Sequence, residues 1–190
     1  MKEKKIAMSP HVFAVFEEIV QKNLAGRKIE AVIEPGASAY ALLSMKAFDN
    51  CRKVALNLGF EKISPELERC EMVVGNSNSL AYPDNTFDCV LSSSSLEHDK
   101  YFWKSTAEFL RVLKPGGLAV IGVPIYMTLP DDKENTTRTF ARHGIRYNAD
   151  FYRFSPQCME EVFFEGYSEV VEKVIVRTDP NPYAVFAGRK

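Results

Sequence analysis

The sequence predicts an α/β protein whose seven strands form a doubly wound, mostly parallel sheet in a three-layer αβα sandwich. Short apolar stretches of strand length alternate with helix-like segments along most of the chain, which is the pattern of parallel sheets with helical crossovers. The last two strand-like stretches are joined by a short turn, so the sheet should end in an antiparallel hairpin. With 190 residues, 46% of them hydrophobic, we expect one domain spanning 1–190.

Each strand is predicted from an apolar run bounded by turn residues. The run at 52–60 is apolar on both faces, as expected of a strand inside a parallel sheet. The closing hairpin joins its two strands through DPN. In chain order, the predicted strands are KIEAVIE (28–34), RKVALNLGF (52–60), EMVVG (71–75), FDCVLSS (87–93), LAVIGVP (118–124), SEVVEKVIVRT (168–178) and PYAVFAGRK (182–190).

The helices are predicted from apolar spacing together with start and stop signals. Ser64 and Ser155 each precede a proline, which favours a capped helix start. Pro115 and the two glycines after it should stop the helix before them. The predicted helices are PHVFAVFEEIVQKNL (10–24), SAYALLSMKAF (38–48), ISPELERC (63–70), YFWKSTAEFLRVLK (101–114) and SPQCMEEVFFEGY (155–167).

One long segment, at about 125–154, lacks clear periodicity. Segments of this length inside a folded domain are usually functional lids or mobile loops. We therefore interpret it as a lid-like insertion that excludes water from a site.

Composition excludes several classes of function. The formal charge is −1, with 24 basic and 25 acidic residues, so no broad basic face for nucleic acid is expected. The chain has neither a signal-peptide pattern nor an apolar run of the ~20 residues that span a membrane, which favours a cytoplasmic protein. The four cysteines are scattered singly and are interpreted as buried free thiols, without a metal site. A homo-oligomer is neither implied nor opposed.

Two motifs in the middle of the chain carry a family resemblance. YPDNTFDCVLSSSSLEH (82–98) is similar to the pattern FPDxSFDxVxxxxxxEH, and FLRVLKPGGLAVIGVP (109–124) is similar to xxRVLKPGGxLxxxxP. In this order, and with AVIEPGASAYALL (31–43) before them, they resemble the class I S-adenosylmethionine-dependent methyltransferases, in particular the small type 11-like domain family with a VLDxGxGxG opening. The resemblance covers nearly the whole chain. It implies a Rossmann-like fold, with S-adenosylmethionine as cofactor and S-adenosylhomocysteine as product.

The resemblance implies where the cofactor would bind. Gly36 would open the turn beneath the methionine end of the cofactor. Asn57 follows Gly36 by twenty-one residues, close to the ~20-residue offset of the acidic residue that usually holds the ribose hydroxyls. Asn76 stands where the family has an aspartate that accepts from the adenine amino group. The full predicted set of cofactor-binding residues is Glu34, Gly36, Ser38, Asn57, Asn76, Ser77, Ser92 and Ser93.

This chain departs from the family pattern at three of these places. Only the first glycine of GxGxG is present, because Ser38 and Tyr40 replace the others. Neutral asparagines replace carboxylates at Asn57 and Asn76, and neutral hydrogen bonds are weaker than charged ones by about 1 kcal/mol. Cofactor binding should therefore be tens to hundreds of times weaker than at a standard site.

Each of these residues also has a plain structural interpretation. Gly36 could only let the chain turn, and Glu34 could be a solvated strand end. Asn57 and Asn76 could cap turns, since asparagine favours such positions.

The residues for the methyl acceptor are expected around the fourth strand and the irregular segment. His98 and His143 are candidate bases, because the ordinary pKa of histidine lies near neutrality. His98 could equally cap a helix or pack. Tyr147, Tyr152 and Arg153 are candidates for binding the substrate.

The leading hypothesis is methyl transfer to a small molecule or a glycan precursor by in-line displacement. The glycan hint comes from DFYRFSP (150–156), which resembles a segment of methyltransferases that act in cell-surface polysaccharide assembly. A second hypothesis keeps the fold without the reaction: an inactive protein that binds a protein partner. A nicotinamide-dependent oxidoreductase is disfavoured because GxGxxG is absent.

Overall fold

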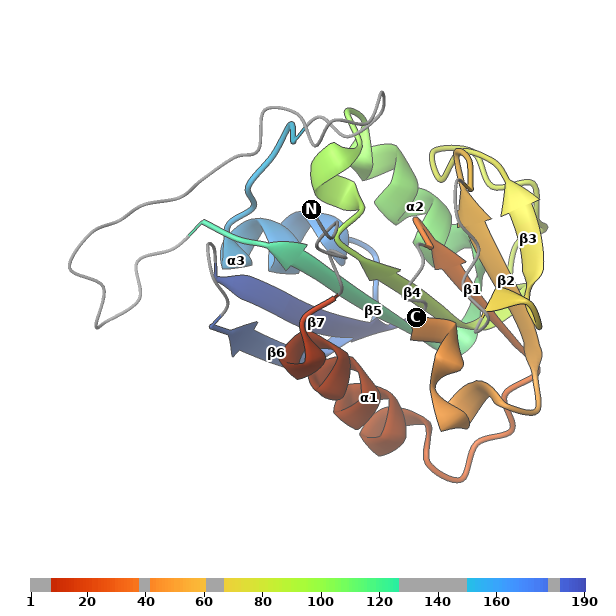
Figure 1. Cartoon of the computed structure of the whole chain (residues 1–190). Coiled ribbons are helices and arrows are strands. Elements are labelled where there is room, and N and C mark those ends of the chain that lie inside the picture. The colour runs from red at the N-terminus through yellow and green to blue at the C-terminus, as the bar shows by residue number, and fades with distance from the viewer. Residues whose placement is uncertain (1–7, 38–41, 61–66, 127–149, 178–181) are drawn as a thin grey trace, which may run out of the picture.

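The computed structural model describes residues 8–37, 42–60, 67–126, 150–177 and 182–190. Its centre is one seven-stranded sheet with the order β3-β2-β1-β4-β5-β7-β6 (Figure 1). All seven predicted strands are present, and the predicted fold class is confirmed. The strands are β1 (Ala31–Pro35), β2 (Arg52–Asn57), β3 (Glu71–Val74), β4 (Phe87–Ser93), β5 (Leu113–Pro124), β6 (Glu169–Val176) and β7 (Tyr183–Arg189).

The direction of the strands creates one functional edge. The strands β1 to β5 pair in parallel, so all five have their carboxyl ends on the same side. The chain order reverses between β1 and β4, which makes a topological switch point there. In open α/β sheets, ligands bind beyond the carboxyl ends of the strands at such a point.

The hairpin at the end of the sheet runs against this direction. Strand β7 lies antiparallel between β5 and β6, and Pro124 of β5 pairs with Tyr183 of β7. Because β7 is reversed, its first residue rather than its last reaches the carboxyl edge of the parallel strands.

One face of the sheet packs against α1 (Pro10–Leu24), as Figure 1 shows. The helix turns one apolar side toward the strands, and Phe16 and Val20 are fully buried. They belong to one hydrophobic core with Val32, Leu91 and Val120, which lie on three neighbouring strands. Apolar spacing along 10–24 predicted this helix, and it is confirmed.

The opposite face is covered by α2 (Phe102–Val112) and by α3 (Pro156–Cys158), which continues as a π-helical turn, η5 (Met159–Phe163). Phe109 and Phe163 are buried there in a second core. The predicted cap at Ser155 is present, since its hydroxyl accepts from the Cys158 amide at 3.0 Å. Gly166 leaves the helix at φ +81°, as expected of a glycine exit.

Three expectations about local structure were wrong. The described part of 38–48 is not one helix but two short 3-10 turns, η1 (Leu42–Ser44) and η2 (Lys46–Phe48). Met45 breaks them with an extended conformation, φ −60° and ψ 137°. The helix expected over 101–114 ends at Val112, and β5 begins at the next residue. Of the cysteines, only Cys89 is buried; all four are free thiols. The cap predicted at Ser64 lies outside the described residues.

Both ends of the predicted irregular segment are fixed to the sheet. Ile125 is fully buried and forms a parallel bridge with Phe154. The Tyr126 amide donates to the Phe154 carbonyl at 2.7 Å, and the Ile125 amide donates to the Pro182 carbonyl at 2.9 Å. Residues 127–149 lie outside the described part of the chain. Among the described helices, none has both the length and the apolar character needed to cross a membrane.

Candidate active site

The acidic residue at the end of β1 is buried rather than solvated. Glu34 is 3% exposed, and its Oε2 accepts a hydrogen bond from the Leu43 amide at 3.2 Å. Burial raises the pKa of Glu34 to about 8, although the Leu43 and Leu42 amides act in the opposite direction. The carboxyl group of Glu34 therefore holds the start of η1 through this hydrogen bond. The alternative prediction, that Glu34 is a solvated residue at the end of a strand, was wrong. Its cofactor role stays a prediction.

Gly36 has a steric reason to be glycine. Its φ is +84°, and a Cβ at this position would lie 2.2 Å from Ser95 Oγ. The amides of Gly36 and Ala37 both donate to the Leu56 carbonyl, at 2.8 and 3.1 Å. The turn is thus held against the ends of β2 and β4, at the switch point. Ser38 lies outside the described residues.

The side chains of Asn57 and Asn76 both bond to backbone groups of other residues. Asn57 Nδ2 donates to the Ala37 carbonyl at 2.7 Å, and its Oδ1 accepts from the Leu58 amide at 2.7 Å. Asn76 Oδ1 accepts from the Asn78 amide at 2.9 Å, which is an Asx turn. The turn-forming interpretation is thus confirmed for Asn76, whereas Asn57 joins two loops, and ligand contact by either side chain stays a prediction. Near Asn76, Ser77 Oγ accepts from Ser105 Oγ at 2.9 Å.

The serines that end β4 are bonded to neighbouring strands. Ser92 is buried, and its Oγ donates to the Pro35 carbonyl at 3.3 Å. Ser93 Oγ lies 2.8 Å from Tyr183 Oη, and the Tyr183 hydroxyl also accepts a hydrogen bond from the Ser94 amide at 3.1 Å. Ser94 has φ +49°. Burial strongly raises the pKa of Tyr183. The loop after β4 is therefore fixed by the first residue of β7.

Beyond this loop lies a largely buried cluster of four charged or titratable residues, contributed by two segments; only the side chain of His98, at 23%, is partly exposed. Glu97 and His98 belong to η4 (Leu96–His98), and Asp150 and Arg153 come from the described stretch before α3. His98 Nδ1 lies 3.0 Å from Asp150 Oδ1, and Arg153 donates to Asp150 Oδ2 at 2.6 Å. The side chains of Asp150 and Arg153 are only 1% and 6% exposed.

Glu97 is the unusual member of this cluster. It is 3% exposed, and its backbone carbonyl accepts from the Phe151 and Tyr152 amides at 2.8 and 3.3 Å. Its Oε1 lies 3.9 Å from His98 Nε2. Burial raises the pKa of Glu97 to about 8; Arg153 lowers it and Asp150 raises it further.

The other predicted acceptor residues divide into three groups. Arg153 belongs to the buried cluster. Tyr152 donates from its hydroxyl to the Lys100 carbonyl at 2.9 Å, and its ring packs 5.0 Å from that of Phe102. His143 and Tyr147 lie outside the described residues.

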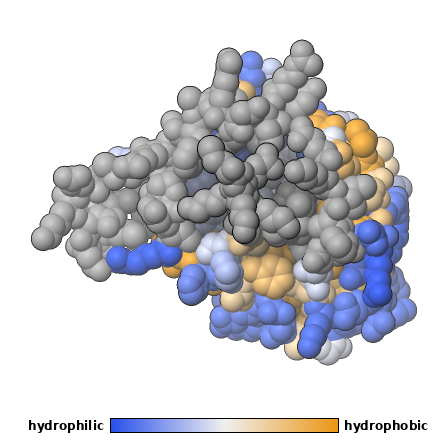
Figure 2. Space-filling view, viewed as in Figure 1, coloured by the Kyte–Doolittle hydropathy of each residue, from blue (hydrophilic) through white to orange (hydrophobic). Residues whose placement is uncertain are grey.

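Two residues of the candidate site were not predicted from the sequence. Asp150 is the first residue of DFYRFSP (150–156), but nothing in that stretch indicated that it meets His98, fifty-two positions away in the chain. Leu58 directly follows Asn57 and is 59% exposed, an open apolar side chain at the carboxyl edge. Figure 2 shows apolar surface on the side of the molecule where β2 and β3 lie. Leu58 directly follows Asn57, the position expected to hold the ribose hydroxyls, and this spacing could have indicated a residue close to the cofactor.

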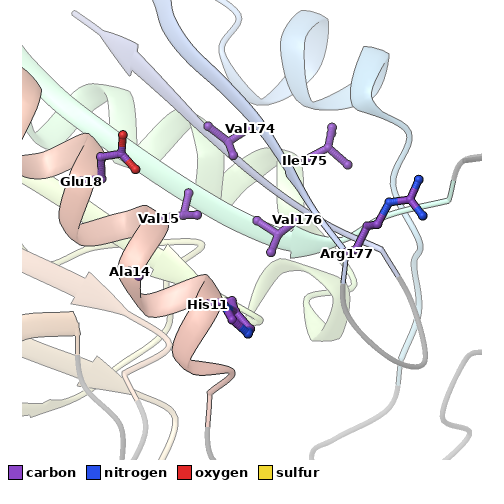
Figure 3. A pocket seen from close by; sticks show the side chains of 8 residues that line it. All are labelled: His11, Ala14, Val15, Glu18, Val174, Ile175, Val176 and Arg177. Atoms are coloured by element: carbon purple, nitrogen blue, oxygen red, sulfur yellow. The ribbon is translucent and has the colours of Figure 1, made fainter.

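A separate groove of about 460 Å³ lies away from this cluster, between α1 and the edge strand β6 (Figure 3). None of the predicted site residues lines it. His11 and Arg177 stand at one end and Val15 and Val174 on its walls. Within the described ranges, no group of three or more His, Cys, Asp or Glu residues is arranged to hold a metal ion.

The fold and its polar carboxyl edge define a class, the open doubly wound α/β proteins that bind a ligand at a topological switch point. The chain belongs to the methyltransferase domain family, whose model matches residues 25–121. This match covers the sheet from β1 to β4 and most of β5. Membership of the family implies S-adenosylmethionine as the methyl donor.

Similarity to curated proteins is limited to part of the chain. A ubiquinone/menaquinone biosynthesis C-methyltransferase (UbiE) of Francisella tularensis subsp. tularensis is 29% identical over 107 residues, which cover 52% of this chain and 43% of that protein. The chain therefore spans less than half the length of the curated relatives it matches.

Solved structures match over nearly the whole chain at low identity. A Burkholderia thailandensis 1,6-didemethyltoxoflavin-N1-methyltransferase, determined with bound 1,6-didemethyltoxoflavin and S-adenosylhomocysteine, matches with a TM-score of 0.70 and 20% identity, covering 94% of this chain and 77% of that one. The [4+2]-cyclase SpnF matches with a TM-score of 0.68 and 15% identity, covering 98% and 84%. These likenesses establish the fold, which serves more than one chemistry.

Proposed function

We propose that this chain transfers the methyl group of S-adenosylmethionine to a small-molecule acceptor bound beyond β4. The observation that carries the proposal is the contact between the partly exposed His98 and the buried side chain of Asp150, which stands at the carboxyl edge of a methyltransferase-family sheet. Buried titratable groups at such an edge are typical of catalytic sites.

The described residues at the edge suit this cofactor. The turn at Gly36, whose φ is +84° and which Ser95 approaches closely, lies at the switch point, where the methionine end of the cofactor would bind. Leu58, which is 59% exposed, would pack on the flat face of adenine. Asn76 and Ser77 lie at the end of β3, within the same edge, and would bind the polar rim of the base.

The chain's own contribution to the reaction would be to place the acceptor and to remove a proton. When bound, S-adenosylmethionine supplies an electrophilic methyl group on a positively charged sulfur. The short distance between His98 Nδ1 and Asp150 Oδ1 favours the tautomer with hydrogen on Nδ1. Nε2 is then the nitrogen that accepts a proton from a hydroxyl or an amine of the acceptor. Asp150 is held in turn by Arg153.

Two acceptor classes follow from different observations. The glycan-precursor hypothesis depends on the stretch at 150–156, which contributes Asp150 and Arg153 to the cluster with Glu97 and His98. The curated relatives named for quinone biosynthesis motivate an aromatic carbon acceptor as the alternative. An acceptor screen should include both classes.

The test is calorimetric titration of the purified protein with S-adenosylmethionine and S-adenosylhomocysteine. We expect both to bind, and Leu58→Glu to weaken binding at least tenfold without altering the fold, because Leu58 is exposed. Val162→Glu is the matched control, since Val162 is also an exposed apolar residue, at 39%. No binding up to millimolar ligand, or equal effects of the two variants, would contradict the proposal.

A second candidate is a protein that keeps the fold but has lost the reaction and binds a partner protein. It is favoured by the polar groups at the edge that already bond to the protein itself, including the amides of Gly36 and Ala37 and both polar atoms of Asn57. The same titration separates the two, because the inactive protein would bind neither ligand.

A further inference from the structure

The side-chain amide of Asn78 is fixed in one orientation. Its Nδ2 donates to Asp99 Oδ2 at 2.7 Å and to Ser105 Oγ at 2.8 Å, and the Tyr101 carbonyl lies 3.3 Å from the same nitrogen. A carboxylate and a backbone carbonyl can only accept hydrogen bonds. The reverse orientation would place the amide oxygen against the Asp99 carboxylate, so the nitrogen must face these groups.

Asp99 is itself bonded through both of its carboxylate oxygens. Its Oδ2 also accepts from Ser105 Oγ at 2.6 Å, and its Oδ1 accepts from the Tyr101 amide at 2.8 Å. Ser105 lies in α2 and is fully buried. These bonds hold the Asp99 carboxylate against Asn78, and they tie the loop after β3 to the start of α2.

The amide oxygen of Asn78 is left unused by this network. Within the described part of the chain, the side-chain bonds of Asn78 all run through Nδ2, and Oδ1 has no partner. The buried side-chain atoms without a partner in the described ranges are Glu97 Oε2 and Tyr167 Oη. Asn78 Oδ1 is not one of them, so it is accessible at the surface. The protein therefore presents a fixed and open hydrogen-bond acceptor at this position.

Asn78 lies in the loop that follows β3, at the carboxyl edge of the sheet. Its backbone amide donates to Asn76 Oδ1 at 2.9 Å, and the Gly75 amide donates to the Asn57 carbonyl at 2.9 Å. The loop thus begins beside the residue that precedes Leu58, the side chain proposed to pack on adenine. The open acceptor and the base of the cofactor would share this part of the edge.

We propose that Asn78 Oδ1 accepts a hydrogen bond from the amino group of the cofactor's adenine, and that Asp99 is the positioning residue that keeps this oxygen available. The amino group is the hydrogen-bond donor that adenine carries, and it matches a fixed acceptor. This inference rests on the proposed function for the presence of the cofactor. It adds a residue that selects adenine over a base with a carbonyl oxygen at the same place.

The experiment compares S-adenosylhomocysteine with S-inosylhomocysteine, in which a carbonyl oxygen replaces the amino group of the base. Calorimetric titration of the full chain gives the ratio of the two dissociation constants. We expect the wild type to bind the adenosyl compound at least about tenfold more tightly. Asn78→Ala should reduce this preference by a factor of about five, because the acceptor is lost.

Asp99→Asn is the sharper variant, because it keeps the shape of the side chain. An amide at position 99 can donate to Asn78, which allows the Asn78 amide to turn and to present Nδ2 in place of Oδ1. We expect the preference for the adenosyl compound to fall below about threefold. The matched control is Asp84→Asn, the same change at a carboxylate that is 68% exposed and pairs with Arg111; it should keep the wild-type ratio.

A role limited to holding the loop would weaken the binding of both ligands by the same factor and leave their ratio unchanged. An unchanged ratio in either folded variant, or equal binding of the two ligands by the wild type, would overturn the proposal. Urea unfolding shows which variants fold, and Asp99→Asn decides alone if Asn78→Ala does not. Failure of the proposed function is read separately, as the absence of binding of either ligand to the wild-type protein.

Discussion

Asn57 Nδ2 donates a hydrogen bond to the carbonyl oxygen of Ala37 at 2.7 Å, which joins the ends of β1 and β2. An aspartate, which family resemblance favours at this position, has no hydrogen to donate. We therefore expect Asn57→Asp to destabilise the protein by about 1–3 kcal/mol and to bring no gain in affinity for S-adenosylhomocysteine. Urea unfolding and calorimetry at pH 7 check both parts.

Asn76→Asp is the matched control for that change. Asn76 uses its Oδ1 to accept from the Asn78 amide, and a carboxylate accepts equally well. This variant should keep the stability of the wild type, and it should bind S-adenosylhomocysteine several-fold more tightly. If the two aspartate variants behave alike, the bond between Asn57 and Ala37 does not matter.

Gly36→Ala tests the close approach of Ser95. The φ of +84° costs an L-residue about 1–2 kcal/mol, and the overlap of the new Cβ with Ser95 Oγ adds to this. We expect a loss above 2 kcal/mol in the free energy of unfolding. Adding Ser95→Gly should recover the steric part and leave only the backbone cost. Lack of any recovery would refute the steric explanation.

Asp150→Asn removes the negative charge from the buried ion pair of Asp150 and Arg153. Arg153 would lose its short ion pair with Asp150, so we expect a loss of about 3–5 kcal/mol in stability. Asp84→Asn makes the same change in the exposed pair of Asp84 and Arg111, where Asp84 is 68% exposed, and should cost less than about 1 kcal/mol. Denaturant melts of both variants give the comparison. Similar costs would mean that Asp150 is not held as described.

Glu34→Gln should change how stability depends on pH. The pKa of Glu34 is raised in the folded protein to about 8, above its ordinary 4.5, so its contribution is fully present below about pH 4.5 and is lost as pH rises through 8. The variant should equal the wild type at pH 4 and exceed it at pH 9 by up to a few kcal/mol, since each pKa unit corresponds to about 1.4 kcal/mol. Unfolding curves at the two pH values decide; a less stable variant at pH 9 would contradict the expectation.

His98→Ala should lower turnover by about 10²–10⁴-fold if its imidazole removes the proton of the acceptor. Affinity for S-adenosylhomocysteine should stay within twofold, because His98 belongs to the acceptor side. His11→Ala, in the groove beside β6, is the control and should have no effect. Transfer of a labelled methyl group to the acceptor found by screening is the measurement. Unchanged turnover would eliminate His98 as the base.

The sequence predicted the sheet well because strand signals are local. Apolar runs and their turn residues fixed all seven strands, and the terminal hairpin followed from two such runs and a short turn. The segment at 38–48 misled because its apolar residues fit a helical stripe. In the structure Leu42, Leu43, Met45 and Phe48 are all fully or almost fully buried, and Glu34 holds the amides at the start of η1. The hydrogen bond that holds this turn therefore comes from Glu34, which lies in strand β1, nine positions before Leu43.

The candidate site was less predictable than the fold. Residues at strand ends, such as Gly36 and His98, could be found because position along a strand indicates the edge. Their partners could not: Ser95 and Asp150 reach them only in three dimensions. The polar bonds of Asn57 likewise depend on how close two loops lie, which spacing in a sequence does not encode.

The reversed strand β7 has a consequence for how the site is made. Protein synthesis runs from the amino end, and β7 follows every other strand in the chain. Its first residue supplies the hydroxyl that holds Ser93 and Ser94. A nascent chain that already contains β1 to β5 therefore still lacks this support for the loop after β4. The site would be completed late, when β7 inserts between β5 and β6, so a nascent or truncated chain could keep much of its sheet without a finished site.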